Sequence, residues 1–189
     1  MLHIYASKID ASGQHECATA LLNHVFTQLG FSAPVSYERN EHGKPYLLPP
    51  NEKIYVNWSH SGDYILCALS DSEIGVDLER MKRIPEERLV RRVIRGEERA
   101  YYEGVPEEAR IKLFYEYWTL KESFLKAIGT GFYTSLDTFR IIMDGTYPII
   151  RQEVDDRKWQ CRLLDFAEED YAAAICCEEL PDKPVINYL

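Results

Sequence analysis

Hydrophobic positions recur with helical spacing in three parts of the chain. Over residues 18–29 they return every three or four positions, which predicts an amphipathic helix. Gly30 follows this segment at the position of a C-terminal cap. Similar patterns predict one helix over residues 86–103 and another over residues 107–128, which Gly129 is expected to end.

Shorter apolar segments, bounded by residues that favour turns, predict strands. These strands are expected at residues 2–6, 35–39, 54–58, 64–69, 74–78, 138–143, 159–164 and 171–176. Turns are expected at Asn40–Pro45 and at Ser59–Asp63, because both segments are rich in polar residues and contain Gly. The mixture of helices and strands predicts an α+β fold.

Two similar stretches of sequence indicate an internal repeat. Asp63–Ala68 and Asp170–Ile175 each begin with Asp-Tyr and continue with small and apolar residues. A length of 189 residues suits one compact unit. We therefore expect a single unit over residues 1–189, made of two similar α+β halves at approximately residues 1–80 and 81–189.

The charge of the chain is unevenly distributed. The formal net charge is −9, but the segment Arg80–Arg99 carries eight basic and four acidic residues. Binding to nucleic-acid phosphates requires Lys and Arg, so the acidic balance disfavours DNA or RNA as a partner. The basic segment favours docking of an acidic partner; the alternative is that its own Glu residues pair with the arginines.

Cysteine usage and hydropathy indicate the cellular compartment. The five cysteines include no Cys-x-x-Cys pair and no metal-type spacing, which favours reduced thiols in a cytoplasmic protein. The first residues lack the pattern of a signal peptide. No apolar run approaches the roughly 20 residues of a membrane span. We expect a soluble cytoplasmic protein with no membrane contact.

Two carboxylates on one predicted strand form the first candidate site. Asp77 and Glu79 are two positions apart in Gly75–Glu79, so both point to one face of the strand, with Cα atoms roughly 7 Å apart. A hard cation such as Mg²⁺ would offset their mutual repulsion, since it prefers oxygen ligands. The alternative is a half-exposed strand whose acidic side chains are solvated.

The longest predicted helix carries the second candidate site. Trp118, Glu122 and Lys126 are four residues apart and therefore share one face of the helix. Spacing alone favours a surface ion pair between Glu122 and Lys126, which stabilises a protein little. The aligned Trp, with Gly129 and Gly131 beyond it, also permits a face directed at a ligand.

Two short segments are candidates for binding phosphate. In Asn57–Gly62, His60 lies between two serines, one of them Ser59, and precedes a glycine. In His42–Pro45, a glycine allows close approach of the backbone and Lys44 offers a positive charge. The alternative in each case is a plain turn. A Ser/His hydrolase is disfavoured because the chain has no Gly-x-Ser-x-Gly elbow.

In their order along the chain, these motifs resemble one family. Gly-Lys-Pro, Ser-His-Ser, Gly-Val-Asp-Leu-Glu and Trp-x-x-Lys-Glu-Ser-x-x-Lys-x-x-Gly-x-Gly follow one another between Glu41 and Gly131. Together they are similar to the motifs of the 4′-phosphopantetheinyl transferases of the longer, surfactin-synthetase-activating (Sfp-like) type. The resemblance implies a monomer of two similar α+β halves with the active site between them.

The resemblance also implies a reaction and the residues that perform it. Family members transfer the 4′-phosphopantetheine arm of coenzyme A to a serine of an apo acyl or peptidyl carrier protein, use Mg²⁺ and release 3′,5′-ADP. The positions that match metal ligands of the family are Asp77, Glu79 and Glu122. The positions that match contacts to coenzyme A are Lys44, Ser59, His60 and Lys126. Glu122 and Lys126 are the implied catalytic residues, as general base and as the cation beside the leaving phosphate.

The sequence departs from the family in two places. Gln14–Gly30 contains no Lys or Arg, whereas family members usually hold the 3′-phosphate of coenzyme A with basic residues there. Some family members have a further Glu at the metal site, preceded by a Phe-rich segment. Here Val93–Gly96 stands in place of that segment, and Glu98 aligns best with the further Glu, with Glu97 adjacent. The basic segment is implied to dock the acidic carrier through arginines on one side of a helix, namely Arg88, Arg91, Arg92, Arg95 and Arg99.

A non-catalytic binding protein is the alternative function. The basic segment and 23 aromatic residues are compatible with binding of nucleotides or single-stranded RNA, and a silent relative would bind coenzyme A without turnover. Neither class requires Asp77, Glu79 and Glu122 to converge, so the arrangement of these acids distinguishes the alternatives.

Overall fold

The computed structural model describes residues 1–10, 13–82, 86–143 and 145–189, so Arg83 of the basic segment lies outside the described residues. The helices are α1 (Gln14–Gln28), α2 (Glu87–Val93), α3 (Glu97–Gly104), α4 (Glu107–Ile128) and the 3-10 turn η1 (Gly131–Tyr133). The strands are β1 (Leu2–Lys8), β2 (Tyr37–Arg39), β3 (Pro45–Leu47), β4 (Tyr55–Ser61), β5 (Tyr64–Ser70), β6 (Ile74–Arg80), β7 (Phe139–Ile142), β8 (Ile149–Gln152), β9 (Gln160–Leu163), β10 (Tyr171–Cys177) and β11 (Ile186–Tyr188). The expected α+β class is confirmed.

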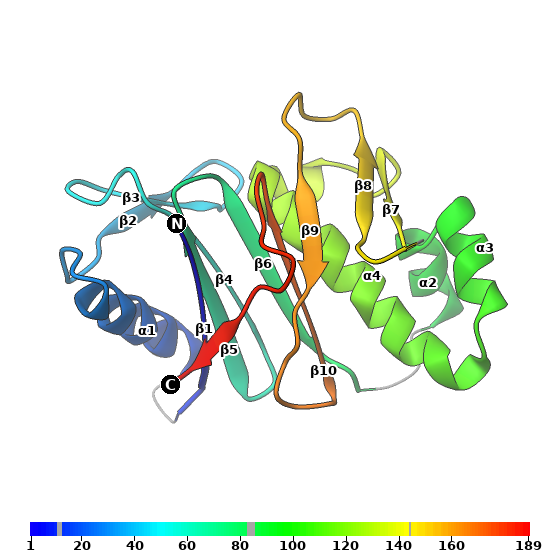
Figure 1. Ribbon diagram of the computed structural model, residues 1–189, viewed down its shortest axis with the longest axis horizontal. Coiled ribbons are helices and arrows are strands. Elements are labelled where there is room, and N and C mark those ends of the chain that lie inside the picture. Colours follow the sequence, from blue (N-terminus) through cyan, green and yellow to red (C-terminus); the bar gives the residue numbers. More distant parts are fainter. Residues whose placement is uncertain (11–12, 83–85, 144) are drawn as a thin grey trace.

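The main elements form four layers, with two sheets enclosed between α1 and α4 (Figure 1). The first sheet has the strand order β11-β1-β5-β4, and the second has the order β6-β10-β9. Separate apolar cores lie between α1 and the first sheet, between the two sheets, and between the second sheet and α4. Because alternate residues of a strand face opposite sides, β5 and β10 are buried at every position.

The longest helix agrees with its prediction. α4 spans Glu107–Ile128, and Gly129 ends it with a φ of 75° in the left-handed region. Glycine adopts this conformation without the steric cost that a Cβ would impose. The backbone N–H of Gly129 donates to the carbonyl of Leu125 at 3.0 Å, which satisfies a carbonyl in the last turn.

The single helix predicted over residues 86–103 is wrong, because the chain forms α2 and α3 with a break between them. Ile94 is extended, and Gly96 has a φ of 55°. The buried carboxylate of Glu98 accepts a hydrogen bond from the backbone N–H of Arg95 at 3.0 Å, which fixes the start of α3. The arginines of the basic segment therefore do not share one helix face.

The predicted turn at Ser59–Asp63 is also too long. β4 continues through Ser61 and pairs Ser61 with Tyr64 of β5, so only Gly62 and Asp63 form the turn. The additional strands β3, β8 and β11 are each three or four residues long, which is too short for a clear alternating pattern.

Strands from both predicted halves pair within each sheet. β6, of the first half, pairs antiparallel with β10 of the second, and β11, of the second half, pairs parallel with β1 of the first. The similarity of the two halves stays a prediction. Among the described residues, none of the helices combines the length and apolar character needed to span a bilayer.

Candidate functional site

A close approach between β6 and α4 brings the two candidate motifs together. A Cβ added to Gly75 would lie 2.1 Å from the Ser123 carbonyl oxygen and 2.4 Å from the Ala127 nitrogen. Only a glycine therefore allows the β6 backbone to lie against this turn of α4. Asp77 follows two residues later on β6, opposite the helix turn that carries Glu122 and Lys126.

Polar side chains of β4 tie it to β6. Asn57, Ser59 and Ser61 alternate along β4 and therefore face the same way. The Asn57 side-chain oxygen accepts a hydrogen bond from the Val76 backbone N–H at 3.0 Å. The hydroxyl of Ser59 donates to Asp77 Oδ1 at 2.8 Å, and that of Ser61 donates to a Glu79 oxygen at 2.9 Å. Ser59 thus orients an acid of the candidate site.

Lys126 crosses from α4 to β6. Its Nζ lies 2.7 Å from Asp77 Oδ1, 3.0 Å from Ser59 Oγ and 3.1 Å from the Val76 carbonyl oxygen. The simple surface ion pair with Glu122 is therefore not what this lysine forms. The second carboxylate oxygen of Asp77 is buried and has no hydrogen-bond partner among the described residues.

Glu122 is a half-buried acid whose charge is only partly balanced by nearby cations. Burial raises its pKa to about 7, and the charges of Asp77 and Glu79 act in the same direction, while Lys126 and Arg92 oppose them. Its Oε1 is buried without a hydrogen-bond partner in the described part of the chain. Burial and the charge of Asp77 also raise the pKa of Glu79. These three predicted acids act on one another electrostatically.

The placement and hydrogen-bond partners of the carboxylate oxygens show whether these acids could hold a metal ion. Within the described ranges, no group of three or more His, Cys, Asp or Glu side chains is gathered tightly enough to hold a metal ion. The orphaned oxygens of Asp77 and Glu122 nevertheless fit a hard cation, because a buried carboxylate oxygen without a partner is costly. The Lys126 ammonium balances part of the negative charge of Asp77 and Glu122.

A pocket of about 300 Å³ lies beside Glu122 and Lys126. Its other walls include four residues to which the sequence motifs gave no role: Arg39, His42, Trp58 and Tyr133. The Arg39 guanidinium lies 5.3 Å from the centre of the Trp58 ring, and the His42 and Tyr133 rings are 4.6 Å apart. The sequence feature that could have pointed to them is the presence of basic and aromatic residues in and beside the two phosphate motifs.

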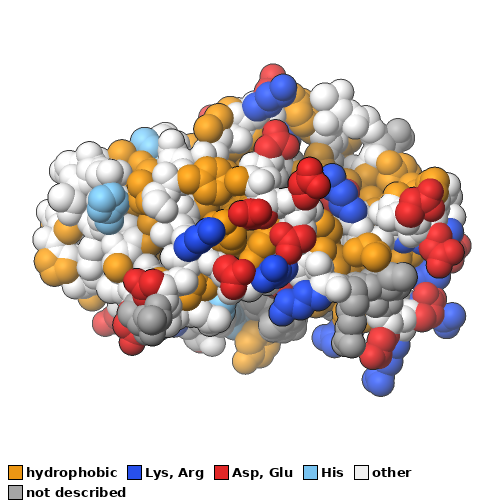
Figure 2. Space-filling model, turned by 90° about the horizontal axis from the view of Figure 1, so that it is seen from below, with side chains coloured by type: hydrophobic (Ala, Val, Ile, Leu, Met, Phe, Trp, Pro, Cys, Tyr) orange, Lys and Arg blue, Asp and Glu red, His pale blue; other side chains and the backbone are white. Residues whose placement is uncertain are grey.

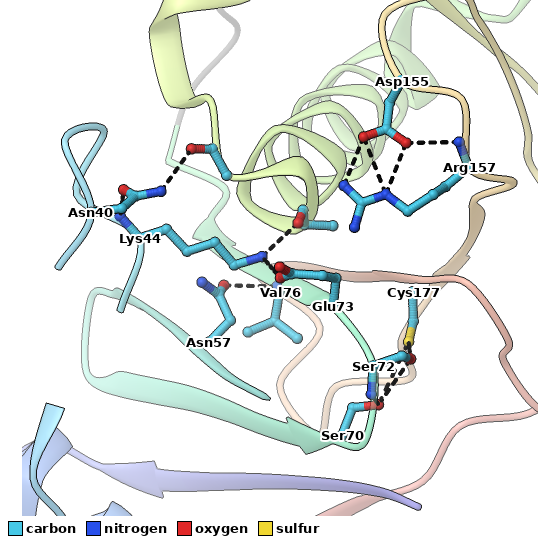
Figure 3. Close-up of polar contacts among 12 residues, drawn as sticks. Asn40, Lys44, Asn57, Ser70, Ser72, Glu73, Val76, Asp155, Arg157 and Cys177 are labelled. Atoms are coloured by element: carbon cyan, nitrogen blue, oxygen red, sulfur yellow. Dashed lines mark hydrogen bonds and ion pairs between the residues drawn. The ribbon is translucent and has the colours of Figure 1, made fainter. Parts of the chain in front are cut away.

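The two predicted phosphate contacts lie in different settings. The Lys44 ammonium donates to the Glu73 carboxylate and to the Ala127 carbonyl (Figure 3). His60 is exposed on β4 and is not among the residues found to line the pocket. The structure therefore gives the pocket Lys126 and Arg39 as cations, and Lys44 contributes to its wall while its ammonium is already paired.

Glu98 does not join the three acids, contrary to its alignment. Its carboxylate is buried and lies 2.7 Å from the Lys121 ammonium. It also accepts hydrogen bonds from the backbone N–H groups of Arg95 and Ile141. Glu97 pairs with Arg151 at 3.2 Å. Both glutamates are therefore committed elsewhere.

The basic segment is partly neutralised by Glu87 within it and by acids from other parts of the chain. Figure 2 shows Lys and Arg interleaved with Asp and Glu at the α2–α3 end of the molecule. The ion pairs among the described residues are Arg80–Asp63, Arg80–Asp170, Arg91–Glu87, Arg95–Asp137, Arg99–Glu87 and Arg99–Glu103. Arg88 and Arg92 have no ion pair with any described residue. Arg92 also lies close enough to Glu122 to lower the pKa of that acid.

Comparisons with known proteins show which family this chain is similar to. The family model of the 4′-phosphopantetheinyl transferase superfamily matches residues 73–176, the segment with the three acids and Lys126. A 4′-phosphopantetheinyl transferase of Bacillus subtilis is 33% identical over 147 residues, covering 76% of this chain and 63% of that protein. The 4′-phosphopantetheinyl transferase Sfp of Bacillus subtilis strain 168 is 31% identical over 153 residues, covering 79% and 66%.

A solved structure was also found, a holo-(acyl-carrier-protein) synthase of Bacillus anthracis strain Ames in complex with CoA (3′,5′-ADP). It has a TM-score of 0.49 and 20% identity, covering 56% of this chain and 93% of that one. The family model covers more than half of the chain, which therefore belongs to the 4′-phosphopantetheinyl transferase superfamily. The chain spans less than two thirds of the length of the two Bacillus subtilis relatives.

Proposed function

We propose that this protein transfers the 4′-phosphopantetheine arm of coenzyme A to a serine of an apo carrier protein. The observation that carries the proposal is the partly buried, charge-rich junction of Asp77, Glu122 and Lys126 beside a pocket with cationic and aromatic walls. The relatives named as 4′-phosphopantetheinyl transferases support the same reaction. A nucleotide-binding protein without turnover would not require a half-buried acid with an elevated pKa, such as Glu122, beside the pocket.

In the proposed reaction, the serine oxygen forms a bond to the β-phosphorus of the coenzyme A pyrophosphate. The bond from that phosphorus to the bridging oxygen breaks, and 3′,5′-ADP leaves with the electron pair. Glu122 accepts the serine proton, because it is the acid that lines the pocket beside Lys126. Lys126, one helical turn away, stabilises the negative charge on the leaving phosphate.

We also propose that Mg²⁺ is the cofactor and that Asp77, Glu79 and Glu122 would hold it. The support is the pair of buried, unpartnered oxygens on Asp77 and Glu122, together with the elevated pKa of Glu79. When bound, the ion supplies neutralisation of charge on the pyrophosphate oxygens. Addition of EDTA is expected to abolish transfer, and excess Mg²⁺ to restore it.

A mass measurement tests the transfer itself. The protein is incubated with Mg²⁺, coenzyme A and a panel of apo acyl and peptidyl carriers, and the carriers are analysed for a phosphopantetheine increment. The expected result is an increment on at least one carrier. Binding of coenzyme A with no increment on any carrier would instead favour the non-catalytic alternative.

Arg39 is proposed to bind an anionic group of coenzyme A in place of the basic residues missing from α1. Its guanidinium donates to the Gly43 carbonyl at 2.6 Å and has no carboxylate partner among the described residues. Arg39→Ala is expected to weaken coenzyme A binding about tenfold or more, as loss of a charge-assisted hydrogen bond does. Calorimetric titration measures this affinity, and Arg39→Lys should retain part of it. An unchanged affinity in Arg39→Ala would remove the residue from the binding site.

The carrier is proposed to dock near the predicted residues Arg88, Arg91, Arg92 and Arg95, chiefly through the two unpaired ones, Arg88 and Arg92. Arg88→Glu combined with Arg92→Glu is expected to lower kcat/KM for the carrier about tenfold at low salt, because opposite charge steers the encounter. Raising the ionic strength should shrink the difference. Arg151→Glu, on β8, is the control. Equal rates for both variants at low salt would contradict this docking surface.

The protein is further proposed to be a cytoplasmic monomer. Support for the compartment comes from Cys67, Cys161, Cys176 and Cys177, which are buried free thiols. Light scattering of the purified protein measures its mass directly, and a dimer mass would contradict the proposed state.

A further inference from the structure

The turn between β2 and β3 (Asn40–Lys44) is fastened to the C-terminal end of α4. Lys44 donates to the Ala127 carbonyl, and the Asn40 side-chain amide donates to the Gly129 carbonyl at 3.4 Å (Figure 3). The last carbonyls of a helix have no partner within the helix, and a cation near them is favourable. Two side chains of the turn therefore occupy the free end of the helix that carries Glu122 and Lys126.

The stem of Lys44 contributes to the pocket wall, and its ammonium has partners of its own. A Cβ added to Gly129 would lie 2.9 Å from Lys44 Cδ, so the stem passes directly over this glycine. The Lys44 side chain is only 10% exposed. The ammonium is thereby committed to Ala127 and Glu73, which leaves it poorly placed to act as a phosphate ligand.

Glu73 supplies the counter-charge for this lysine. It lies in the β5–β6 turn, beside the ammonium at the far end of the Lys44 side chain (Figure 3). Burial lowers the pKa of Lys44, Glu73 raises it, and the nearby Arg157 lowers it further. Arg157 is itself held by Asp155 at 2.6 Å, so Glu73 is the carboxylate that balances the Lys44 charge.

We propose that Glu73 is a positioning residue for the proposed transfer reaction, acting through Lys44 to hold the β2–β3 turn against α4. This turn and its flanking Arg39 form one side of the pocket, and α4 forms the other. The proposal rests on the proposed function for its kinetic consequences only. The Asp77–Lys126 pair is separate from this contact, so the proposal predicts a change in coenzyme A binding and a nearly constant chemical step.

Glu73→Gln is the central variant, since it keeps the shape and removes the charge. The KM for coenzyme A is expected to rise about tenfold, with kcat within about twofold, because the uncompensated ammonium leaves its position and releases the turn. Lys44→Met should show the same pattern. The double variant should be little worse than either single variant, since residues of one pair are not additive. Glu73→Asp should restore part of the affinity.

Hydrogen exchange gives a readout that does not depend on turnover. The amides of His42, Gly43 and Lys44 are expected to exchange about tenfold faster in Glu73→Gln, while those of the core strand β5 keep their protection. Asp71→Asn, in the same β5–β6 turn and 66% exposed at its side chain, is the matched control and should change neither exchange nor KM.

The outcomes separate this proposal from the proposed function. Absence of transfer in the wild-type protein would reject the function, while faster exchange in Glu73→Gln would still support the contact. Wild-type exchange in the β2–β3 turn of Glu73→Gln would overturn the proposal. A lower KM in Glu73→Gln would also overturn it, because it would mean that the released Lys44 binds the substrate phosphate directly. Additive effects of the two single variants on KM would likewise overturn the proposal, because Glu73 and Lys44 would then act independently.

Discussion

Glu122→Gln is expected to reduce kcat for phosphopantetheine transfer by about 10²–10⁴, the range that removal of a general base produces. The amide has nearly the same shape as the carboxylate but cannot accept the serine proton at neutral pH. Coenzyme A binding measured without Mg²⁺ should largely persist, since the pocket walls formed by Arg39 and Trp58 are unaffected. Single-turnover measurements on a modified carrier, together with calorimetric titration of coenzyme A, separate these two effects.

The same substitution should make the metal-free protein more resistant to unfolding at alkaline pH. The pKa of Glu122 is raised from an ordinary 4.5 to about 7 in the folded state. The folded protein thus retains a proton that the unfolded chain has lost, and the wild-type free energy of unfolding falls as pH rises through this interval. Glu122→Gln abolishes that loss. Thermal unfolding in EDTA at pH 5 and pH 8 measures the difference between variant and wild type.

Glu108→Gln is the matched control for both measurements. Glu108 lies in the exposed first turn of α4, far along the same helix, and its loss should change neither kcat nor the pH dependence of unfolding. Wild-type kcat in Glu122→Gln would transfer the role of base to another group. A melting temperature that falls at pH 8 would mean that the Glu122 charge is compensated in the folded protein.

Local patterns predicted the elements whose contacts are local. The spacing of Trp118, Glu122 and Lys126 placed them on one helix face, and the alternation at Asp77 and Glu79 placed both acids on one strand face. Gly75 joins the two elements, because only a residue without a Cβ permits the backbone approach. The central site was therefore accessible from the sequence once the helix, the strand and the glycine between them were identified.

The parts that sequence did not predict depend on contacts between distant residues. Lys44 and Glu73 are 29 positions apart, and no periodicity relates them. Arg39 belongs to the pocket because its strand pairs with β3, a strand of only three residues. The break between α2 and α3 depends on the buried Glu98, whose partner Lys121 is 23 positions away. Each of these contacts is set by packing of layers, which local pattern does not determine.

The buried ion pair between Glu98 and Lys121 gives the largest expected effect on stability. Both residues are 1% exposed, and the Lys121 ammonium also donates to the Val93 carbonyl at 2.6 Å. The pair therefore ties α4 to the end of α2 and the start of α3. Removing one partner of such a pair leaves a buried charge and typically costs about 3–5 kcal/mol.

Glu98→Gln is expected to lower the free energy of unfolding by about 3–5 kcal/mol, and Lys121→Met by an amount near the lower end of that range. The difference arises because Glu98 keeps the backbone N–H donors of Arg95 and Ile141 when the lysine is removed. In Glu98→Gln the lysine retains only neutral acceptors. Burial already lowers the pKa of Lys121, and Glu98 opposes that shift. The loss of free energy of unfolding in Glu98→Gln should therefore be smaller at pH 9 than at pH 6, because the neutral Lys121 amine is easier to bury than the ammonium.

Urea unfolding of both single variants and of the double variant measures this coupling. The double variant Glu98→Gln, Lys121→Met should be more stable than the sum of the single losses predicts, since it leaves no unpaired charge. Single losses below about 1 kcal/mol would place this pair among ordinary surface ion pairs and contradict its assigned role. Lys121 faces α2 and α3, whereas Glu122, the next residue of α4, faces the pocket. Folded variants should therefore keep their affinity for coenzyme A. A large loss of that affinity would mean that the two faces of α4 are coupled.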